Sequence, residues 1–183
     1  TRRSSDLYYD VGNEPEKSEY ITLINLNENK GGKIFAEIAR AMPHKSFLGV
    51  LGSYDEQITQ TLPNVTYVPN SPNIKQWYAQ TRILLMPSKY ESWGRTATEA
   101  MCSGIPVICS DTPGLRENCE KGGIFIKNRD NVKEWVEAIT KLDDKKAYSW
   151  ASRKAKARSR EFDTRKTLDE FESWFRESVN KYS

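Results

Sequence analysis

The chain has 183 residues, of which 37% are hydrophobic and 29% are charged, and its formal net charge is +3. This length supports one domain with a hydrophobic core and is too short for two Rossmann-like domains. The small net charge gives no case for nucleic acid as a partner, and no apolar stretch is long enough to cross a bilayer.

No amino-terminal segment has the layout of a secretory signal, and the chain starts at Thr1 rather than at methionine, so we expect a fragment of a longer protein. Three cysteines, Cys102, Cys109 and Cys119, show no CxxC motif and no metal-like spacing. This cysteine usage favours a reducing, cytoplasmic compartment. A single histidine, His44, cannot build a histidine-based metal site.

Residues 1–18 are polar and lack periodicity, which predicts a linker or tail ahead of a single domain over residues 19–183. From Tyr20 onwards, short apolar runs alternate with amphipathic segments. The runs expected to form buried parallel strands are Tyr20–Leu26, Ser46–Leu51, Val65–Val68, Ile83–Met86, Pro106–Cys109 and Gly123–Ile126. The segments expected to form helices between them are Gly32–Ala41, Asp55–Thr61, Asn73–Gln80, Arg95–Ser103 and Asn131–Leu142.

This alternation predicts an α/β fold, namely a Rossmann-like, doubly wound parallel sheet of about six strands with flanking helices. After the last strand, two C-terminal helices are expected over Asp143–Glu161 and Thr164–Tyr182. Basic residues crowd the first of them: Lys145, Lys146, Arg153, Lys154, Lys156, Arg158 and Arg160. A solvated helix face is the simpler interpretation, and peripheral contact with an anionic membrane is the functional alternative.

A glycine-rich turn follows the first predicted strand, in the segment from Asn25 to Lys33. Gly31 and Gly32 open a helix there, so backbone amides and the positive end of the helix dipole suit a phosphate. Lys30 adds a full positive charge at the same place. The spacing fits neither GxGxxG nor a P-loop, which argues against a dinucleotide oxidoreductase.

The sharpest signal follows the fourth predicted strand, where Glu91 lies in a loop, Gly94 and Arg95 open a helix, and Glu99 sits one turn into that helix. Amides around Gly94 suit a diphosphate. A carboxylate has two oxygens that match the two donors of a vicinal diol. We therefore expect Glu99 to bind ribose hydroxyls and Glu91 to bind hydroxyls of a sugar.

Glu91, seven intervening residues and Glu99, within Tyr-Glu-Ser-Trp-Gly…Glu-Ala-Met-Cys-Ser-Gly-Ile-Pro-Val-Ile, resemble the E-x7-E segment of the retaining GT4 family. These are glycosyltransferases of GT-B architecture, and residues from about Tyr20 to Leu142 resemble their C-terminal, nucleotide-sugar-binding domain. The resemblance implies that Lys30 binds the diphosphate and acts with Glu91 in catalysis. It implies further donor contacts from Gly31, Ser92, Trp93, Gly94, Arg95, Thr96 and Glu99.

Three positions depart from or extend that pattern. The family commonly carries an Arg where this chain has Asn25, so Arg95 or Lys33 is a candidate for the missing charge. The segment Asp111–Glu117 takes the place of the family's Gly-rich loop. The fold position predicts that the nucleotide base lies over Val68 and Pro69.

The implied reaction is retaining transfer of a hexose from a nucleotide-diphosphate sugar, with no cofactor and no metal, since the chain has no Asp-x-Asp triplet. An N-terminal acceptor-binding domain of the same full-length protein is the implied partner, so the fragment alone is expected to transfer nothing. The alternatives are a degenerate, non-catalytic binding module, which Asn25 favours, and a sugar-nucleotide epimerase of GT-B architecture.

Overall fold

The structure is a computed structural model that describes residues 12, 14–162 and 164–182, without the side chains of 164–167 and 180–182. Its six strands are β1 (Tyr20–Ile24), β2 (Phe47–Val50), β3 (Val65–Val68), β4 (Thr81–Met86), β5 (Val107–Ser110) and β6 (Gly123–Ile126). They form one sheet in the order β3-β2-β1-β4-β5-β6, and every neighbouring pair is parallel. This confirms the predicted doubly wound, Rossmann-like sheet.

Helices connect the strands and extend the chain beyond the last of them. They are α2 (Gly32–Ala41), α3 (Lys75–Tyr78), α4 (Arg95–Cys102), α5 (Pro113–Cys119), α6 (Val132–Lys141), α7 (Lys145–Ser159) and α8 (Thr164–Tyr182), with short 3-10 turns η1 (Pro15–Lys17) and η2 (Glu120–Gly122). The two predicted C-terminal helices are thus present as α7 and α8. The segment predicted as a tail includes η1, and the Glu16 carbonyl accepts a hydrogen bond from Arg82 on β4.

One predicted helix is wrong, because residues 55–61 form an irregular loop. Backbone groups of this loop bond to distant partners instead of to one another. The Ile58 amide donates to the Leu26 carbonyl at 3.0 Å, and the Gln60 amide donates to the Tyr67 hydroxyl at 3.0 Å. Asp55 adopts a φ of 59°, which a right-handed helix cannot contain.

A helix also stands where the sequence analysis predicted a loop after the fifth strand. Thr112 caps α5 by accepting a hydrogen bond from the Leu115 amide, and Pro113 occupies the first turn, where a missing N–H costs nothing. Gly114 allows this helix to lie directly on the backbone of residues 91–92, since any Cβ there would collide with their carbonyl groups. The helix therefore braces the loop that follows β4.

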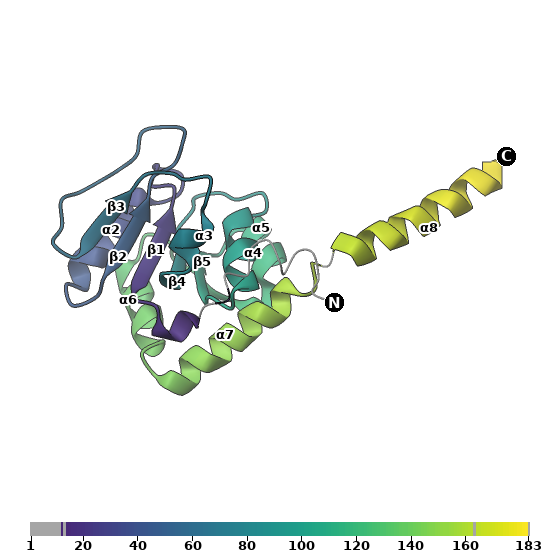
Figure 1. Cartoon of the computed structure of the whole chain (residues 1–183). Helices are drawn as coiled ribbons and strands as arrows, with labels where there is room; N and C mark the ends of the chain where they lie inside the picture. The colour runs from purple at the N-terminus through teal and green to yellow at the C-terminus, as the bar shows by residue number, and fades with distance from the viewer. Residues whose placement is uncertain (1–11, 13, 163, 183) are drawn as a thin grey trace.

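Two hydrophobic cores cover the two faces of the sheet. One joins alternate strand residues such as Ile83 and Leu85 to α2 and α6, and the other joins Leu84 and Met86 to α4 and α5. Helix α7 crosses the amino end of the sheet (Figure 1) and contributes to both cores. This period-two alternation buries side chains on both faces of the sheet, so a ligand site is expected at the carboxyl ends of the strands.

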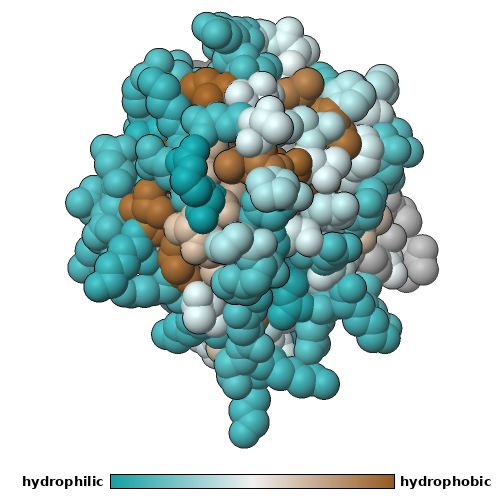
Figure 2. Space-filling view, turned by 90° about the vertical axis from the view of Figure 1, so that its left-hand side faces the viewer, coloured by the Kyte–Doolittle hydropathy of each residue, from teal (hydrophilic) through white to brown (hydrophobic). Residues whose placement is uncertain are grey.

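Helix α8 extends away from the sheet (Figure 1). It carries an exposed apolar stripe of Leu168, Phe171, Trp174, Phe175 and Val179. The face that carries β3 and α2 is different, since Figure 2 shows only separate hydrophobic patches among hydrophilic residues there.

Candidate functional site

A cleft of about 430 Å³ opens at the carboxyl ends of β1, β2 and β4. Strands β1 and β4 are neighbours, and the strand order reverses at this pair, which is where open α/β sheets bind ligands. Among the described residues that line the cleft, Lys30 and Arg95 are the cations and Glu91 is the acid. The lining therefore carries a net positive charge and suits an anion that also bears hydroxyl groups.

Asn25 begins the loop after β1 in the left-handed region, with a φ of 67°, which asparagine tolerates better than most residues. Its Oδ1 accepts hydrogen bonds from the Asn27 amide at 3.2 Å and from Gln57 Nε2 at 3.0 Å. Its side chain also packs against Gly52, where no Cβ would fit. Asn25 lines the cleft as a neutral, firmly held group.

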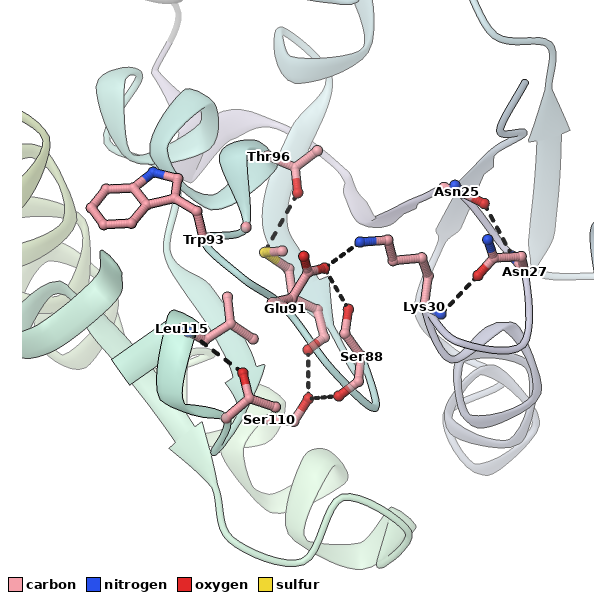
Figure 3. Close-up of polar contacts among 12 residues, drawn as sticks. Asn25, Asn27, Lys30, Ser88, Glu91, Trp93, Thr96, Ser110 and Leu115 are labelled. Carbon is pink, nitrogen blue, oxygen red and sulfur yellow. Dashed lines mark hydrogen bonds and ion pairs between the residues drawn. The ribbon is translucent and has the colours of Figure 1, made fainter. Parts of the chain in front are cut away.

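Lys30 crosses from the β1 loop to the β4 loop, and its Nζ lies 2.5 Å from Glu91 Oε1 (Figure 3). The same Oε1 accepts a hydrogen bond from Ser88 Oγ at 2.9 Å. The Glu91 side chain is only 8% exposed, whereas that of Lys30 is 25% exposed. The two residues to which the sequence analysis gives catalytic roles therefore form a partly buried ion pair at the centre of the cleft.

The start of α2 differs from the expectation for a phosphate loop. Gly31 has a φ of 90° and lies so close to Pro87 that a Cβ would collide with it, so only glycine fits. The amides of Gly31 and Gly32 both donate to the Asn27 carbonyl, at 3.1 and 3.2 Å. These two amides are thus already satisfied within the loop.

The start of α4 is more open to a ligand. Gly94, with a φ of 82°, precedes the helix and offers no side-chain cap. The amides of Arg95 and Thr96 have no intrahelical acceptor by geometry, and no described residue accepts from them. Both residues line the cleft, so this helix end can donate to an anion there.

Glu99 lies one turn into α4 and does not line the cleft itself, among the residues that the structure describes. Its side chain is 6% exposed and holds two partners. Tyr78 Oη donates to its Oε2 at 2.7 Å, and Arg95 Nε lies 3.1 Å from its Oε1. Arg95, at 83% exposure, stands between Glu99 and solvent.

Two buried side chains that the sequence analysis did not single out hold the β4 loop in place. Asn118 on α5 is fully buried, and its Nδ2 donates to the carbonyls of Trp93 and Gly94 at 2.8 and 3.0 Å. The single hydroxyl hydrogen of Ser110, at the end of β5, is shared between the carbonyls of Met86 and Ser88, which lie 3.0 and 2.6 Å from its Oγ. Their distance along the chain from Glu91 concealed them, since nothing local marks either residue.

The predicted donor-binding residues do not all meet in the cleft. Those that line it are Asn25, Lys30, Glu91, Ser92, Trp93, Gly94, Arg95 and Thr96. The Trp93 ring turns away from Glu91 and packs edge-on against Phe162 at 5.3 Å (Figure 3). Val68 and Pro69 lie outside the lining, and the next residue, Asn70, is part of it.

Two ion pairs lie outside the cleft: Lys89 with Glu28 on a rim beside it, and Arg116 with Asp111 after β5. A hydrogen bond from Lys89 lowers the pKa of Glu28 below its usual value, and one from Arg116 does the same for the pKa of Asp111. Lys33 lies on this rim with Glu28, Lys89 and Arg129, outside the cleft. The charge of Lys33 therefore lies on the rim and not in the cleft.

The described residues contain no group of three His, Cys, Asp or Glu side chains placed to hold a metal ion. Within the same part of the chain, no helix combines the length and the apolar character needed to span a membrane.

Residues 11–159 match the family described as glycosyl transferases group 1. Among curated proteins, the chain is 30% identical over 100 residues to the lipopolysaccharide core biosynthesis mannosyltransferase LpsB of Rhizobium meliloti, covering 52% of this chain and 28% of that protein. It is 26% identical over 175 residues to a sulfoquinovosyl transferase of Arabidopsis thaliana, covering 89% and 34%. The chain thus spans about a third or less of these relatives.

Among solved structures, a sucrose-phosphate synthase of Thermosynechococcus elongatus superposes with a TM-score of 0.75 at 21% identity, covering 98% of this chain and 51% of that one. Anabaena HepE, solved in complex with UDP-glucose, gives a TM-score of 0.72 at 19% identity, covering 97% and 54%. These likenesses establish a shared fold. Since the family match covers most of the chain, this protein belongs to the group 1 glycosyl transferases.

Proposed function

We propose that this chain is the donor-binding half of a retaining, GT4-like glycosyltransferase and binds a nucleotide-diphosphate sugar in the cleft at β1 and β4. The observation that carries the proposal is the convergence of Lys30, Glu91 and the open start of α4 on one cleft at the strand-order reversal. HepE was solved with UDP-glucose, which makes a UDP-linked hexose the first donor to test.

In this proposal the diphosphate lies between Lys30 and the amides of Arg95 and Thr96. Departure of the nucleoside diphosphate builds negative charge on the phosphate and positive character on the sugar. Fixed donors aimed at that charge lower the barrier by about 3 kcal/mol each in comparable sites. Glu91 binds a sugar hydroxyl, Glu99 binds the ribose diol, and the acceptor attacks from the face that the leaving group vacates, with retention.

Lys30 and the open amides of α4 are placed to bind the diphosphate directly, so we propose that binding needs no divalent metal. Nucleoside diphosphate titrations with and without EDTA test this point. Equal affinities are expected, and an affinity that depends on added Mg²⁺ or Mn²⁺ would contradict it.

Transfer also needs an acceptor site, which we assign to a second Rossmann-like domain of the full-length protein. The apolar stripe on α8 is suited to pack on that domain, because Phe171, Trp174 and Phe175 are each more than half exposed. This chain alone should therefore bind the donor and transfer nothing.

Contact with an anionic membrane is a further part of the proposal. Lys145, Lys146, Arg153 and Lys154 are exposed on α7, and Trp150 among them is 56% exposed. Clustered cations with an interfacial tryptophan suit an anionic lipid surface on the cytoplasmic side. Co-sedimentation with acidic but not with neutral vesicles is expected, and equal recovery with both would contradict membrane contact.

A degenerate binding module is the second candidate, and the neutral, locked side chain of Asn25 is the observation that favours it. A thermal-shift screen with UDP, GDP, ADP and their sugar conjugates separates the two. A ligand that binds only the folded chain raises its melting temperature by mass action. A shift with one nucleotide family supports donor binding, and no shift at millimolar ligand favours the degenerate module.

A further inference from the structure

The cleft lacks one of the charges that its proposed ligand requires. A nucleoside diphosphate carries at least two negative charges on its phosphates, and the cleft's lysine is already paired with Glu91 at 2.5 Å. Asn25 supplies no charge, and its Oδ1 is occupied by Asn27 and Gln57. Lys33 is directed to the rim with Glu28 and Lys89. Among the described lining residues, this leaves Arg95 as the second cation.

Arg95 is placed to serve in that role. It is the first residue of α4, directly beside the two open helix amides, so its guanidinium and those amides share one end of the cleft. Its side chain is 83% exposed, and its contact with protein charge is the pair with Glu99 Oε1 at 3.1 Å. An arginine side chain held at one end is long enough to turn toward a neighbouring phosphate without moving the backbone.

The contacts of Glu99 connect its proposed ribose site with the proposed diphosphate site at Arg95. Tyr78 donates to one of the Glu99 oxygens and Arg95 pairs with the other, and the carboxylate is only 6% exposed, so a ribose diol that approaches Glu99 competes with Arg95 for Oε1. Ribose and diphosphate belong to one donor molecule, so an Arg95 side chain displaced from Glu99 would have the diphosphate beside it as a new partner. We propose that Arg95 binds the donor diphosphate, that Glu99 holds it until ribose binds, and that ribose and diphosphate recognition are thereby coupled.

This inference rests on the proposed function, and the following comparison separates the two. Arg95→Gln removes the charge inside the cleft, whereas Lys33→Gln makes the same charge change on the rim and serves as the matched control. Calorimetry would measure UDP, GDP and ADP on the full chain, and ligand-observed NMR would measure the corresponding nucleosides. Circular dichroism and melting temperature would verify that both variants are folded.

Arg95→Gln is expected to weaken nucleoside diphosphate binding about 10-fold or more, as loss of a charged hydrogen bond does, while Lys33→Gln changes it less than about 2-fold. Nucleoside affinity should stay the same or rise in Arg95→Gln, because Glu99 is freed, and Arg95→Lys should restore part of the diphosphate affinity.

Equal diphosphate affinities in Arg95→Gln and Lys33→Gln would overturn the role of Arg95 and leave the proposed function standing. Parallel losses of nucleoside and diphosphate affinity would also overturn it, since they indicate that Arg95 only shapes the site. Failure of the unsubstituted chain to bind any of the three diphosphates would overturn the proposed function and this inference with it.

Discussion

The loops after β1 and β4, which both line the cleft, are held in place in different ways. The loop after β4 is held by two buried side chains. Asn118 donates hydrogen bonds to the carbonyls of Trp93 and Gly94, and the Ser110 hydroxyl is shared between the carbonyls of Met86 and Ser88. The loop after β1 is fixed from the side by another loop, through Gln57 and Asn25. The β4 loop leads into the unpaired amides at the start of α4. In the β1 loop, the amides of Gly31 and Gly32 are hydrogen-bonded within the loop, and Lys30 contributes its side chain to the cleft. The β4 side of the cleft therefore presents open backbone amides together with Arg95 and Glu91, whereas the β1 side presents the charge of Lys30.

Asn118→Ala should release the loop after β4 and have the largest effect on stability among these variants. It removes the donor to the Trp93 carbonyl, one of the two donors to the Gly94 carbonyl (which keeps the Ala97 amide), and the acceptor of the Thr98 hydroxyl. Because the Asn118 side chain is also fully buried, we expect the free energy of unfolding to fall by about 3 kcal/mol. Urea unfolding measures the loss. Nucleotide affinity should fall as well, because these carbonyls set the start of α4. A fall below about 0.5 kcal/mol would show that α5 does not hold the loop.

Lys30→Ala should remove the ion pair with Glu91 that joins the β1 loop to the β4 loop. The Glu91 carboxylate, 8% exposed, then keeps only Ser88, so a loss of about 2 kcal/mol in unfolding free energy is expected. Nucleoside diphosphate affinity should fall about 30-fold by calorimetry. Lys30→Ala with Glu91→Gln removes the stranded charge and should recover stability but not affinity. Recovery of both would contradict a role for Lys30 in binding the diphosphate.

Gln57→Ala should loosen the β1 side alone. Gln57 Oε1 accepts from the amides of Leu26 and Gly52 at 2.8 and 2.7 Å, but the residue is partly exposed and water can replace it. We expect a loss of about 1 kcal/mol, which is smaller than for Asn118. Equal losses in the two variants would show that both sides of the cleft are held alike.

Comparing Gly94→Ala with Gly104→Ala measures how tightly α5 packs against the start of α4. Both glycines are left-handed, with φ values of 82° and 71°. A Cβ at position 94 would lie 2.7 Å from Leu115, whereas at position 104 the nearest atom is Ser152 Oγ at 3.1 Å. We expect Gly94→Ala to cost about 1 kcal/mol more in thermal unfolding, and equal melting temperatures would show that α5 yields at this contact.

The sheet and most helices could be predicted because buried parallel strands form short apolar runs and α4 lies between Gly94 and Ser103-Gly104. The loop over residues 55–61 could not, because Gln57 and Ile58 bond to residues near position 26 rather than to helical neighbours. In the site, the E-x7-E resemblance pointed to Glu91 and Glu99, and of the two only Glu91 lines the cleft. The pairing of Lys30 with Glu91 spans 61 positions, and Asn118 acts from a helix that the Pro113-Gly114 sequence concealed.

Binding of a nucleoside diphosphate in the cleft between β1 and β4 is tested most directly by amide NMR, because the chain has a mass of only 21.1 kDa. The labelled chain would be titrated with UDP, GDP and ADP. We predict saturable shifts concentrated at Gly94, Arg95 and Thr96 and in the loop around Lys30. Shifts confined to α7 or to the rim near Lys33, with residues 94–96 unchanged, would contradict the site.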